Sequence, residues 1–443
     1  MTTTCRIGGG AGFASDRLDA ALQLAESSDI DTLTLEVLAE RTLALQHMER
    51  GKGKFAYWPL LDRSMRTLLP TIVRRDINII SNMGGADPDG ATEHVRRIAA
   101  QLGYSGMALA TVTGDDVREQ VFKFDPCVVE TGEPLSKLGR DVIAANAYIG
   151  AHSIIEGLQL GARVVIVGRA TDSALALGAC AYKLGWQAGQ WDKIAAGVMA
   201  GHLSECSAQV AGGYFADPPL KTVDRLSEVG FPVIEVEEGG TLWISKAPGS
   251  GGKINRQTVI EQMLYEVHDP CAYLTPDVTV DLTNVSVEEV DGRVKVTGIR
   301  GTAPPPTLKT LLAVENGYVV EGGISFAGIN AVSRARLTQG ILADRFPKLH
   351  IQPSSWVMNI IGMDSCVVNG HNQVVPGEAR LHIGVRALNA DQAEQIAAEI
   401  EGLYTNGPAG GGGIRCTVRR SIQMMSCLLP SDLTTTSARI SHV

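Results

Sequence analysis

The chain has 443 residues, of which 44% are hydrophobic and 20% charged, and its formal net charge is -9. This length allows two or three domains with sizeable cores, and the composition is that of a globular protein rather than a disordered one. The acidic charge is spread along the chain without a basic block, which argues against a nucleic-acid surface. No apolar run approaches the ~18 residues of a membrane span and no signal-peptide pattern opens the chain, so we expect a cytoplasmic protein without a membrane contact.

Eight cysteines are scattered through the chain, and none of them belongs to a Cys-x-x-Cys pair. This spacing is not that of an iron-sulfur or structural zinc framework, and a chain of this length needs no disulfide scaffold. We therefore expect reduced, mostly buried thiols.

Apolar segments in the first half of the chain end in glycine or polar residues, and amphipathic helices separate them. The first segment begins at Ile7, and the later ones span residues 32–35, 77–80, 107–112 and 163–167. Continuous apolar strands separated by helices indicate a parallel sheet that is buried on both faces.

The pattern changes after about Pro218. Residues 278–282 and 294–297 alternate apolar and polar side chains, which is typical of strands with one solvated face. The dipeptide Asp291-Gly292, just before the second run, predicts a hairpin turn.

The sequence thus predicts an α/β fold with two domains. Residues 1–217 are expected to form a mostly parallel sheet flanked by helices, with Gly-rich loops at the strand ends. Residues 218–443 are expected to form a second, α+β domain with antiparallel strands, including a strand over 380–386 and a helix over 390–404.

Ligands of open parallel sheets bind at the carboxyl ends of the strands. This rule selects Glu36, Asn82, Arg169 and Asp172, each of which follows a predicted strand. Arg169 is a candidate for gripping a substrate carboxylate, with Asp172 orienting it, because a guanidinium group matches a carboxylate bidentately. The alternative is a helix cap with a local ion pair.

A glycine-rich run, residues 8–12, follows the first apolar segment and precedes a predicted helix. The backbone N–H groups of Gly9, Gly10, Ala11 and Gly12 are candidates for binding a phosphate or carboxylate. The alternative is a structural tight turn. The run satisfies neither the dinucleotide-binding G-x-G-x-x-G/A spacing nor the P-loop ending, so no nucleotide motif is present.

A helix that begins at Trp191 and continues through the next turns places His202, Glu205, Cys206 and Gln209 on one face. Four interpretations are open. The face supplies a general acid or base in His202 tuned by Glu205, a metal site that lacks a visible third ligand, a Cys206 nucleophile, or a buried polar cluster without chemistry. We expect no metal, and we place Gln209 among the substrate contacts.

Gly410 and Gly411 belong to the longest glycine-containing segment, residues 407–413. Consecutive glycines lose much backbone entropy on folding, which predicts either a close approach of a ligand or a mobile loop. Residues 248–253 end on Lys253 and form either an anion seat or a linker.

Taken together, these motifs resemble those of the acyclic terpene utilisation (AtuA-like) family, a former domain-of-unknown-function family. The resemblance covers most of the chain, and its ordered motifs span residues 7–13, 33–36, 80–84, 168–172, 201–206, 209–217, 262–270 and 407–413.

The resemblance implies a catabolic role, because the family takes its name from gene clusters that degrade citronellol- and geraniol-type compounds through branched acyl-CoA esters. Relatives also occur near genes for carboxylic-acid catabolism. Longer members carry a small additional domain beyond the matched region, which implies for this chain a separate small protein subunit and an oligomeric complex.

We therefore expect an enzyme of the hydratase or lyase type that acts on a branched or dicarboxylic acid or its CoA thioester. The expected acid-base residues are His202, Glu205, Glu36 and Asp172, and no cofactor is expected because no redox or nucleotide motif is present. The alternatives are a non-catalytic scaffold or binding subunit that completes an active site with a small partner, and a metal-dependent hydrolase.

Overall fold

A computed structural model divides the chain into two compact units. Unit 1 contains Met1–Ala313 and Met424–Val443, and unit 2 contains Val314–Gln423. The structure describes residues 3–50, 53–366 and 376–443. The boundary expected after residue 217 lies inside unit 1, because a strand beyond it pairs with the first strand of the chain.

A ten-stranded mixed sheet forms the centre of unit 1, in the order β11-β12-β8-β7-β1-β2-β3-β6-β4-β18. The five central strands β1, β2, β3, β6 and β4 run parallel, as the sequence predicted, and the others extend the sheet with antiparallel pairs. The strands of this sheet are β1 (Thr4–Ala11), β2 (Thr32–Leu35), β3 (Asn78–Ser81), β4 (Ala108–Thr113), β6 (Val164–Val167), β7 (Pro232–Glu237), β8 (Leu242–Lys246), β11 (Ser286–Val290), β12 (Arg293–Thr297) and β18 (Ser437–His442).

Helices cover both faces of this sheet. The helices of unit 1 are α1 (Leu18–Ser27), α2 (Glu40–Arg50), α3 (Leu61–Arg74), α4 (Pro88–Gln101), α5 (Arg118–Phe124), α6 (His152–Gln159), α7 (Ala174–Leu184), α8 (Trp191–Glu205) and α9 (Arg256–Leu264). Helices α1, α3 and α4 share one apolar core with the central strands. Helices α6, α7 and α8 pack together and contact the sheet as well. Short strands β5 (Val142–Ala147), β9 (Tyr273–Leu274), β10 (Thr279–Asp281) and β13 (Arg300–Thr302) complete the unit.

The glycine run belongs to strand β1 and not to a loop, which corrects the expectation of a strand-end loop at residues 8–11. Successive residues of a strand point to opposite faces of the sheet. A Cβ on Gly8 would lie 2.8 Å from Leu24 Cδ2 of α1, and a Cβ on Gly9 would lie 2.6 Å from the Ser204 carbonyl oxygen of α8. The glycines therefore let one helix approach each face of β1.

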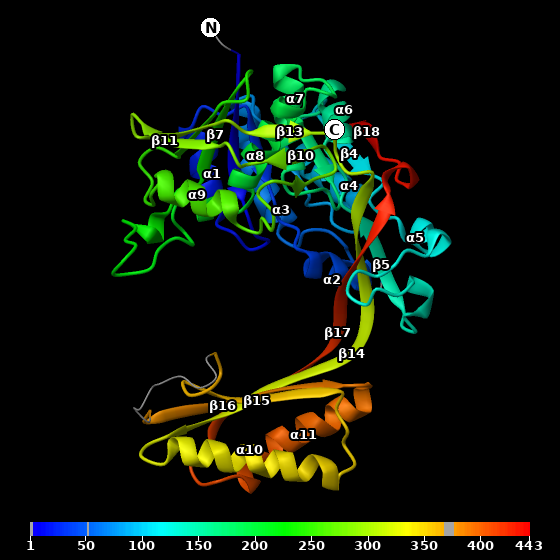
Figure 1. Cartoon of the computed structure of the whole chain (residues 1–443), viewed down its shortest axis with the longest axis vertical. Coiled ribbons are helices and arrows are strands. Elements are labelled where there is room, and N and C mark those ends of the chain that lie inside the picture. The colour runs from blue at the N-terminus through cyan, green and yellow to red at the C-terminus, as the bar shows by residue number, and fades with distance from the viewer. Residues whose placement is uncertain (1–2, 51–52, 367–375) are drawn as a thin grey trace. The chain divides into compact units, whose positions relative to one another are not determined.

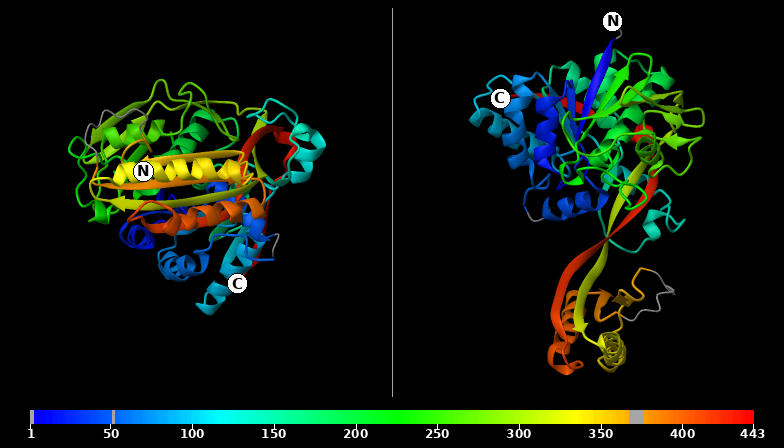
Figure 2. Two further views of the ribbon diagram at one scale, coloured as in Figure 1. Left: turned by 90° about the horizontal axis from the view of Figure 1, so that it is seen from below. Right: turned by 90° about the vertical axis from the view of Figure 1, so that its left-hand side faces the viewer.

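Unit 2 is a four-stranded antiparallel sheet with a β-α-β-β-α-β element order. Its elements are β14 (Thr307–Ala327), α10 (Ala331–Lys348), β15 (Ser355–Ile361), β16 (Glu378–Ala387), α11 (Ala390–Asn406) and β17 (Gly412–Pro430), where β14 begins and β17 ends in unit 1. The strand order is β15-β16-β14-β17. Both helices lie on one face of the sheet (Figure 1), and the view from below in Figure 2 shows them in front of the strands.

Most sequence-predicted elements are present with bounds shifted by a few residues. The hairpin predicted at Asp291-Gly292 joins β11 and β12, and both turn residues have positive φ angles, 48° and 75°. None of the described helices is long and apolar enough to cross a membrane.

Candidate functional site

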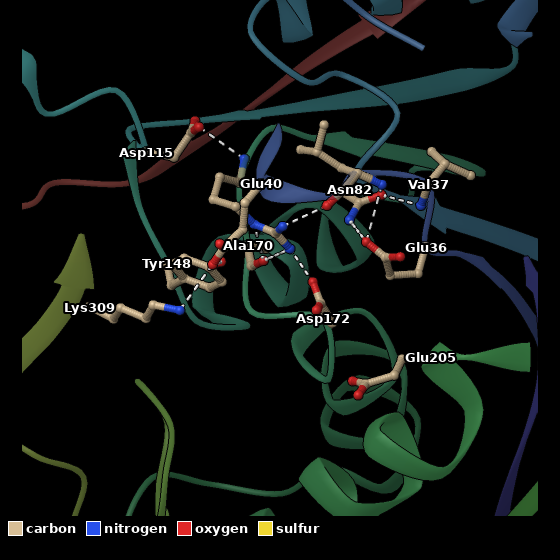
Figure 3. A network of polar contacts seen from close by, with 12 residues as sticks. Glu36, Val37, Glu40, Asn82, Asp115, Tyr148, Ala170, Asp172, Glu205 and Lys309 are labelled. Carbon is tan, nitrogen blue, oxygen red and sulfur yellow. Dashed lines mark hydrogen bonds and ion pairs between the residues drawn. The ribbon is translucent and has the colours of Figure 1, made fainter. Parts of the chain in front are cut away.

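Loops that follow neighbouring parallel strands meet at one edge of the unit 1 sheet. Glu36 follows β2, Asn82 follows β3 and Arg169 follows β6, and these three strands are adjacent. Figure 3 shows the side chains of Glu36 and Asn82 close together, with Asp172 and Glu205 below them. The strand-end rule therefore identified residues that the fold brings together.

Glu36 is held by hydrogen bonds on one carboxyl oxygen. Its Oε1 accepts from Asn82 Nδ2 at 2.6 Å and from the Leu38 backbone N–H at 3.2 Å. Asn82 is fixed in turn, because its Oδ1 accepts from the Val37 N–H at 2.9 Å. Burial and the negative charge of Asp172 raise the pKa of Glu36 to about 8. Glu36 therefore carries a proton at neutral pH.

Arg169 is buried, with 1% of its surface exposed, and its guanidinium nitrogens bind the protein itself. Nη1 donates to the Leu38 carbonyl at 2.6 Å, Nε donates to the Ala170 carbonyl at 2.9 Å, and Nη2 pairs with Asp172. The ring of Tyr148 lies 4.7 Å from the guanidinium carbon. Of the two interpretations of Arg169, this geometry favours the local ion pair over a substrate clamp.

The buried carboxyl group of Asp115 holds the backbone of Arg169 in place. Asp115, after β4, accepts from the Arg169 N–H and from Asn146 Nδ2, both at 2.9 Å. Burial raises the pKa of Asp115 to about 6. A Cβ on Gly168 would lie 2.6 Å from Asp115 Oδ1, so glycine is needed where the loop crosses this carboxyl group.

The end of α8 brings His202 and Glu205 to the same place. His202 Nδ1 lies 3.1 Å from Glu205 Oε1, an ion-pair distance without hydrogen-bond alignment; His202 is buried and 11% of the Glu205 side chain is exposed. Burial acts to lower the pKa of His202, but the Glu205 charge outweighs it and the pKa is raised. Burial raises the pKa of Glu205, partly offset by His202. The ring of Tyr273 lies 5.3 Å from that of His202.

The helix ends at Glu205, so Cys206 and Gln209 do not continue its face as predicted. Ser207 has a φ of +46°, which ends the helical path, and Ser207–Gln209 is a 3₁₀ turn. The close packing of this turn on β1 is the physical reason: a Cβ on Gly12 would lie 2.4 Å from the Cys206 carbonyl carbon. Burial raises the pKa of Cys206, which keeps it a thiol and argues against a nucleophilic role.

These side chains line a cavity of about 780 Å³ within unit 1. It includes six of the predicted site residues, namely Gly12, Glu36, Arg169, Asp172, His202 and Glu205.

The other predicted residues lie elsewhere. Asn82 is fully buried and touches Glu36 from behind, and Gly9, Gly10 and Ala11 are buried within β1. Gln209 lines a neighbouring cavity. Gly410 and Gly411 belong to unit 2, where a Cβ on Gly411 would lie 2.7 Å from Ile324 Cδ1. These two glycines therefore serve the packing of unit 2 and do not join the other candidates.

Sequence reasoning missed Glu40, Tyr148 and Lys309, which form a second wall of the cavity (Figure 3). The Tyr148 hydroxyl donates to Glu40 Oε1, and Lys309 Nζ donates to the same oxygen at 3.0 Å. Burial would raise the pKa of Glu40, but these hydrogen bonds outweigh it and the pKa is lowered. No sequence signal links these residues, because they come from α2, the end of β5 and β14.

Tyr273, Tyr265, Glu266 and Arg41 also line the cavity without having been predicted. Burial raises the pKa of Tyr273, so its hydroxyl stays protonated. The signal for Tyr265 and Glu266 was available, since both belong to a family-like motif at residues 262–270, but the motif suggested no chemistry.

A smaller, mostly apolar cavity of about 330 Å³ adjoins the first and shares Tyr265 with it. We call it the annex. Its lining residues are Gln209, Tyr214, Phe215, Thr258, Ile260, Glu261, Gln262, Leu264 and Tyr265. The annex offers space for hydrocarbon next to the polar cavity.

Within the described residues, no group of three or more His, Cys, Asp and Glu side chains is arranged to hold a metal ion. The carboxyl groups of the cavity instead pair with Arg169, His202, Lys309 and Tyr148. Proton donors and acceptors therefore line the same cavity, as general acid-base catalysis requires.

Comparisons with known proteins identify one family. The profile described as "Acyclic terpene utilisation family protein AtuA" matches residues 5–440. No curated protein has significant sequence similarity to the chain. Among solved structures, an amidase of the hydantoinase/carbamoylase family from Burkholderia phymatum is 17% identical over 25% of this chain and 29% of its own, with a TM-score of 0.17. The match thus spans less than a third of that amidase.

Proposed function

The chain belongs to the acyclic terpene utilisation family, and on that premise we propose that it is a catabolic enzyme of the hydratase or lyase type. The family description implies a role in acyclic terpene catabolism. We propose as substrate a branched or dicarboxylic acid, free or as its CoA thioester. The reaction adds water to a carbon–carbon double bond next to a carbonyl group, or removes it.

The observation that carries this proposal is the pair of carboxyl groups in one cavity, where Asp172 is ion-paired with Arg169 and Glu36 has a raised pKa. Hydration requires a general acid and a general base, and we assign these roles to Glu36 and Asp172. Glu36 Oε1 is occupied by Asn82 and Leu38. Its other oxygen is therefore the one that delivers the proton.

In the proposed step, Asp172 takes a proton from water, and the water oxygen forms a bond to the carbon β to the carbonyl group. Glu36 gives its proton to the α carbon, and solvent exchange returns the two carboxyl groups to their starting states. His202, whose pKa is raised by the neighbouring Glu205, stabilises the negative charge that develops on the carbonyl oxygen.

The annex supports a substrate with a hydrocarbon branch. It shares Tyr265 with the polar cavity, and its lining is mostly apolar. Burying hydrocarbon there contributes about 0.8 kcal/mol for each methylene group.

The proposal is tested by hydrogen exchange at the α carbon. The purified chain is incubated in D₂O with branched and dicarboxylic 3-hydroxy acids, the corresponding 2-enoic acids and the CoA thioesters of both, and deuterium incorporation is followed by NMR. We expect exchange with at least one member, and Glu36→Gln should slow it about 100-fold or more, since general acids contribute 10²–10⁴-fold. Glu93→Gln, at an exposed ion pair on α4, is the matched control.

A wild-type chain that binds members of this panel without exchange or hydration would overturn the enzymatic proposal and assign the chain as a binding subunit. If the Glu36→Gln variant exchanges hydrogen as fast as the wild type, Glu36 is not the general acid.

A further inference from the structure

The cavity contains one positively charged side chain that the protein leaves unused. Of the described residues that line it, Arg41, Arg169 and Lys309 carry a permanent positive charge. Arg169 is buried and its guanidinium nitrogens are bonded to Leu38, Ala170 and Asp172. Arg169 therefore cannot also supply the bidentate fork that an anionic substrate group requires.

Arg41 differs from Arg169 in its exposure and in its lack of partners within the described residues. It is the second residue of α2, it is exposed, and no ion pair or side-chain hydrogen bond joins it to another described residue. Its five guanidinium N–H donors remain free for a ligand. An arginine with these properties on a cavity wall is suited to a carboxylate or phosphate group.

Lys309 stands on the same wall and is held in place. Its Nζ lies 3.0 Å from Glu40 Oε1 and 4.8 Å from the centre of the Tyr148 ring. The ammonium group has three donors, and Glu40 uses one of them. Since about half of the Lys309 side chain is exposed, the remaining donors are open to a ligand.

We propose that Arg41 and Lys309 form the anion-binding site of this cavity and that Arg41 determines specificity for substrates with an anionic group away from the reacting carbons. The inference deepens the proposed function, because it rests on the same cavity and replaces the predicted Arg169 clamp. The anionic group is a second carboxylate in a free dicarboxylic acid or a phosphate of a CoA thioester.

Binding of non-reacting probes tests this site without requiring turnover. Glutarate represents the dicarboxylate and free coenzyme A the phosphate source, and both are titrated into the wild-type chain by isothermal titration calorimetry at low salt. We expect at least one probe to bind, and Arg41→Ala should weaken it about 10- to 100-fold, the range for a charge-assisted bidentate contact. Arg41→Lys should recover part of the affinity, because charge remains without the fork.

Arg63→Ala is the matched control, because Arg63 is an exposed arginine near the start of α3 that does not line the cavity. It changes the net charge equally and should leave the affinity within about twofold. Preferential binding of glutarate would assign the carboxylate source, and preferential binding of coenzyme A the phosphate source.

Failure of both probes to bind, or equal losses in Arg41→Ala and Arg63→Ala, would overturn the proposal. The acid-base proposal fails separately, because Glu36→Gln should retain probe binding while losing exchange. Loss of exchange with intact probe binding therefore concerns Glu36, and loss of probe binding concerns Arg41.

Discussion

Glu36 shows how a single side chain acquires a function from its surroundings. Its carboxyl group is ordinary in sequence, but burial and the nearby Asp172 make its ionised form unfavourable. Asn82 and the Leu38 N–H hold one oxygen in place. These two hydrogen bonds act to lower the pKa of Glu36, but burial and Asp172 outweigh them and leave the group protonated at neutral pH.

The raised pKa of Glu36 predicts a falling rate of exchange as pH rises through about 8, because the proton donor is lost. It also predicts a stability effect. The folded chain binds this proton more tightly than the unfolded chain, so folding stability falls between the unfolded pKa of ~4.5 and the folded pKa. At about pH 9, Glu36→Gln should be more stable than the wild type, on the order of 2 kcal/mol, in urea unfolding.

Near pH 4, where both states hold the proton, the two proteins should have similar stability. A Glu36→Gln variant that is less stable than the wild type at the higher pH would contradict the raised pKa.

The site depends on the close packing of α8 and the turn that follows it against β1 and the start of α7. Gly12 comes directly after β1, where a Cβ would meet the backbone of Cys206 at 2.4 Å, and Gly201 lies within α8, where a Cβ would meet Ser173 Cα, next to α7, at 2.5 Å. Backbone atoms cannot rotate away as side chains do. Gly12 and Gly201 therefore fix where His202 and Glu205 lie.

Gly12→Ala should move the end of α8 and destabilise the fold by about 2 kcal/mol, as overpacking of a well-packed contact does. The partly exposed helix position Gly402 in α11 has open space at its Cβ, so Gly402→Ala should be neutral or stabilise by about 0.5–1 kcal/mol. Thermal unfolding of both variants checks this contrast. Equal changes in stability would show that the close backbone contact at Gly12 does not exclude a Cβ.

The apolar runs of the sequence predicted the central strands, because a parallel sheet buried on both faces needs continuous hydrophobicity. The glycine run was predicted as a loop, because its small residues carry no apolar signal, whereas it forms the end of β1 between two helices. The helical spacing of residues also predicted that α8 continues beyond Glu205, because a 3.6-residue period carries no information about the turn at Ser207.

In the whole molecule, the chain passes from unit 1 into unit 2 along β14 and returns along β17. β14 and β17 are adjacent in the sheet, and the division between the units cuts both of them. Unit 2 has its own core, built from α10, α11 and the strands they cover. Each unit thus has the features of an independently folding domain.

Replacing Val314–Gln423 with a short Gly/Ser turn should leave unit 1 folded, because the cut ends lie on neighbouring strands about 5 Å apart. We expect cooperative unfolding of the shortened chain by circular dichroism and retained binding of the anionic probes. A separately produced fragment of residues 314–423 should unfold cooperatively as well. Loss of the unit 1 transition after the replacement would show that the two units fold only together.

The parallel sheet and the polar residues that end its strands follow from the amino-acid sequence alone, since the hydrophobic period and the position of a strand end are local properties of the chain. The sequence therefore assigned Glu36, Asn82, Arg169 and Asp172 to the ends of strands, and β2, β3 and β6, which precede them, are neighbours in the sheet. Only the tertiary structure decided which of them face the cavity, because exposure and partners depend on elements far apart in the chain. Glu40, Tyr148 and Lys309 meet through β5 and β14, and Arg169 is occupied by carbonyl groups that no spacing reveals.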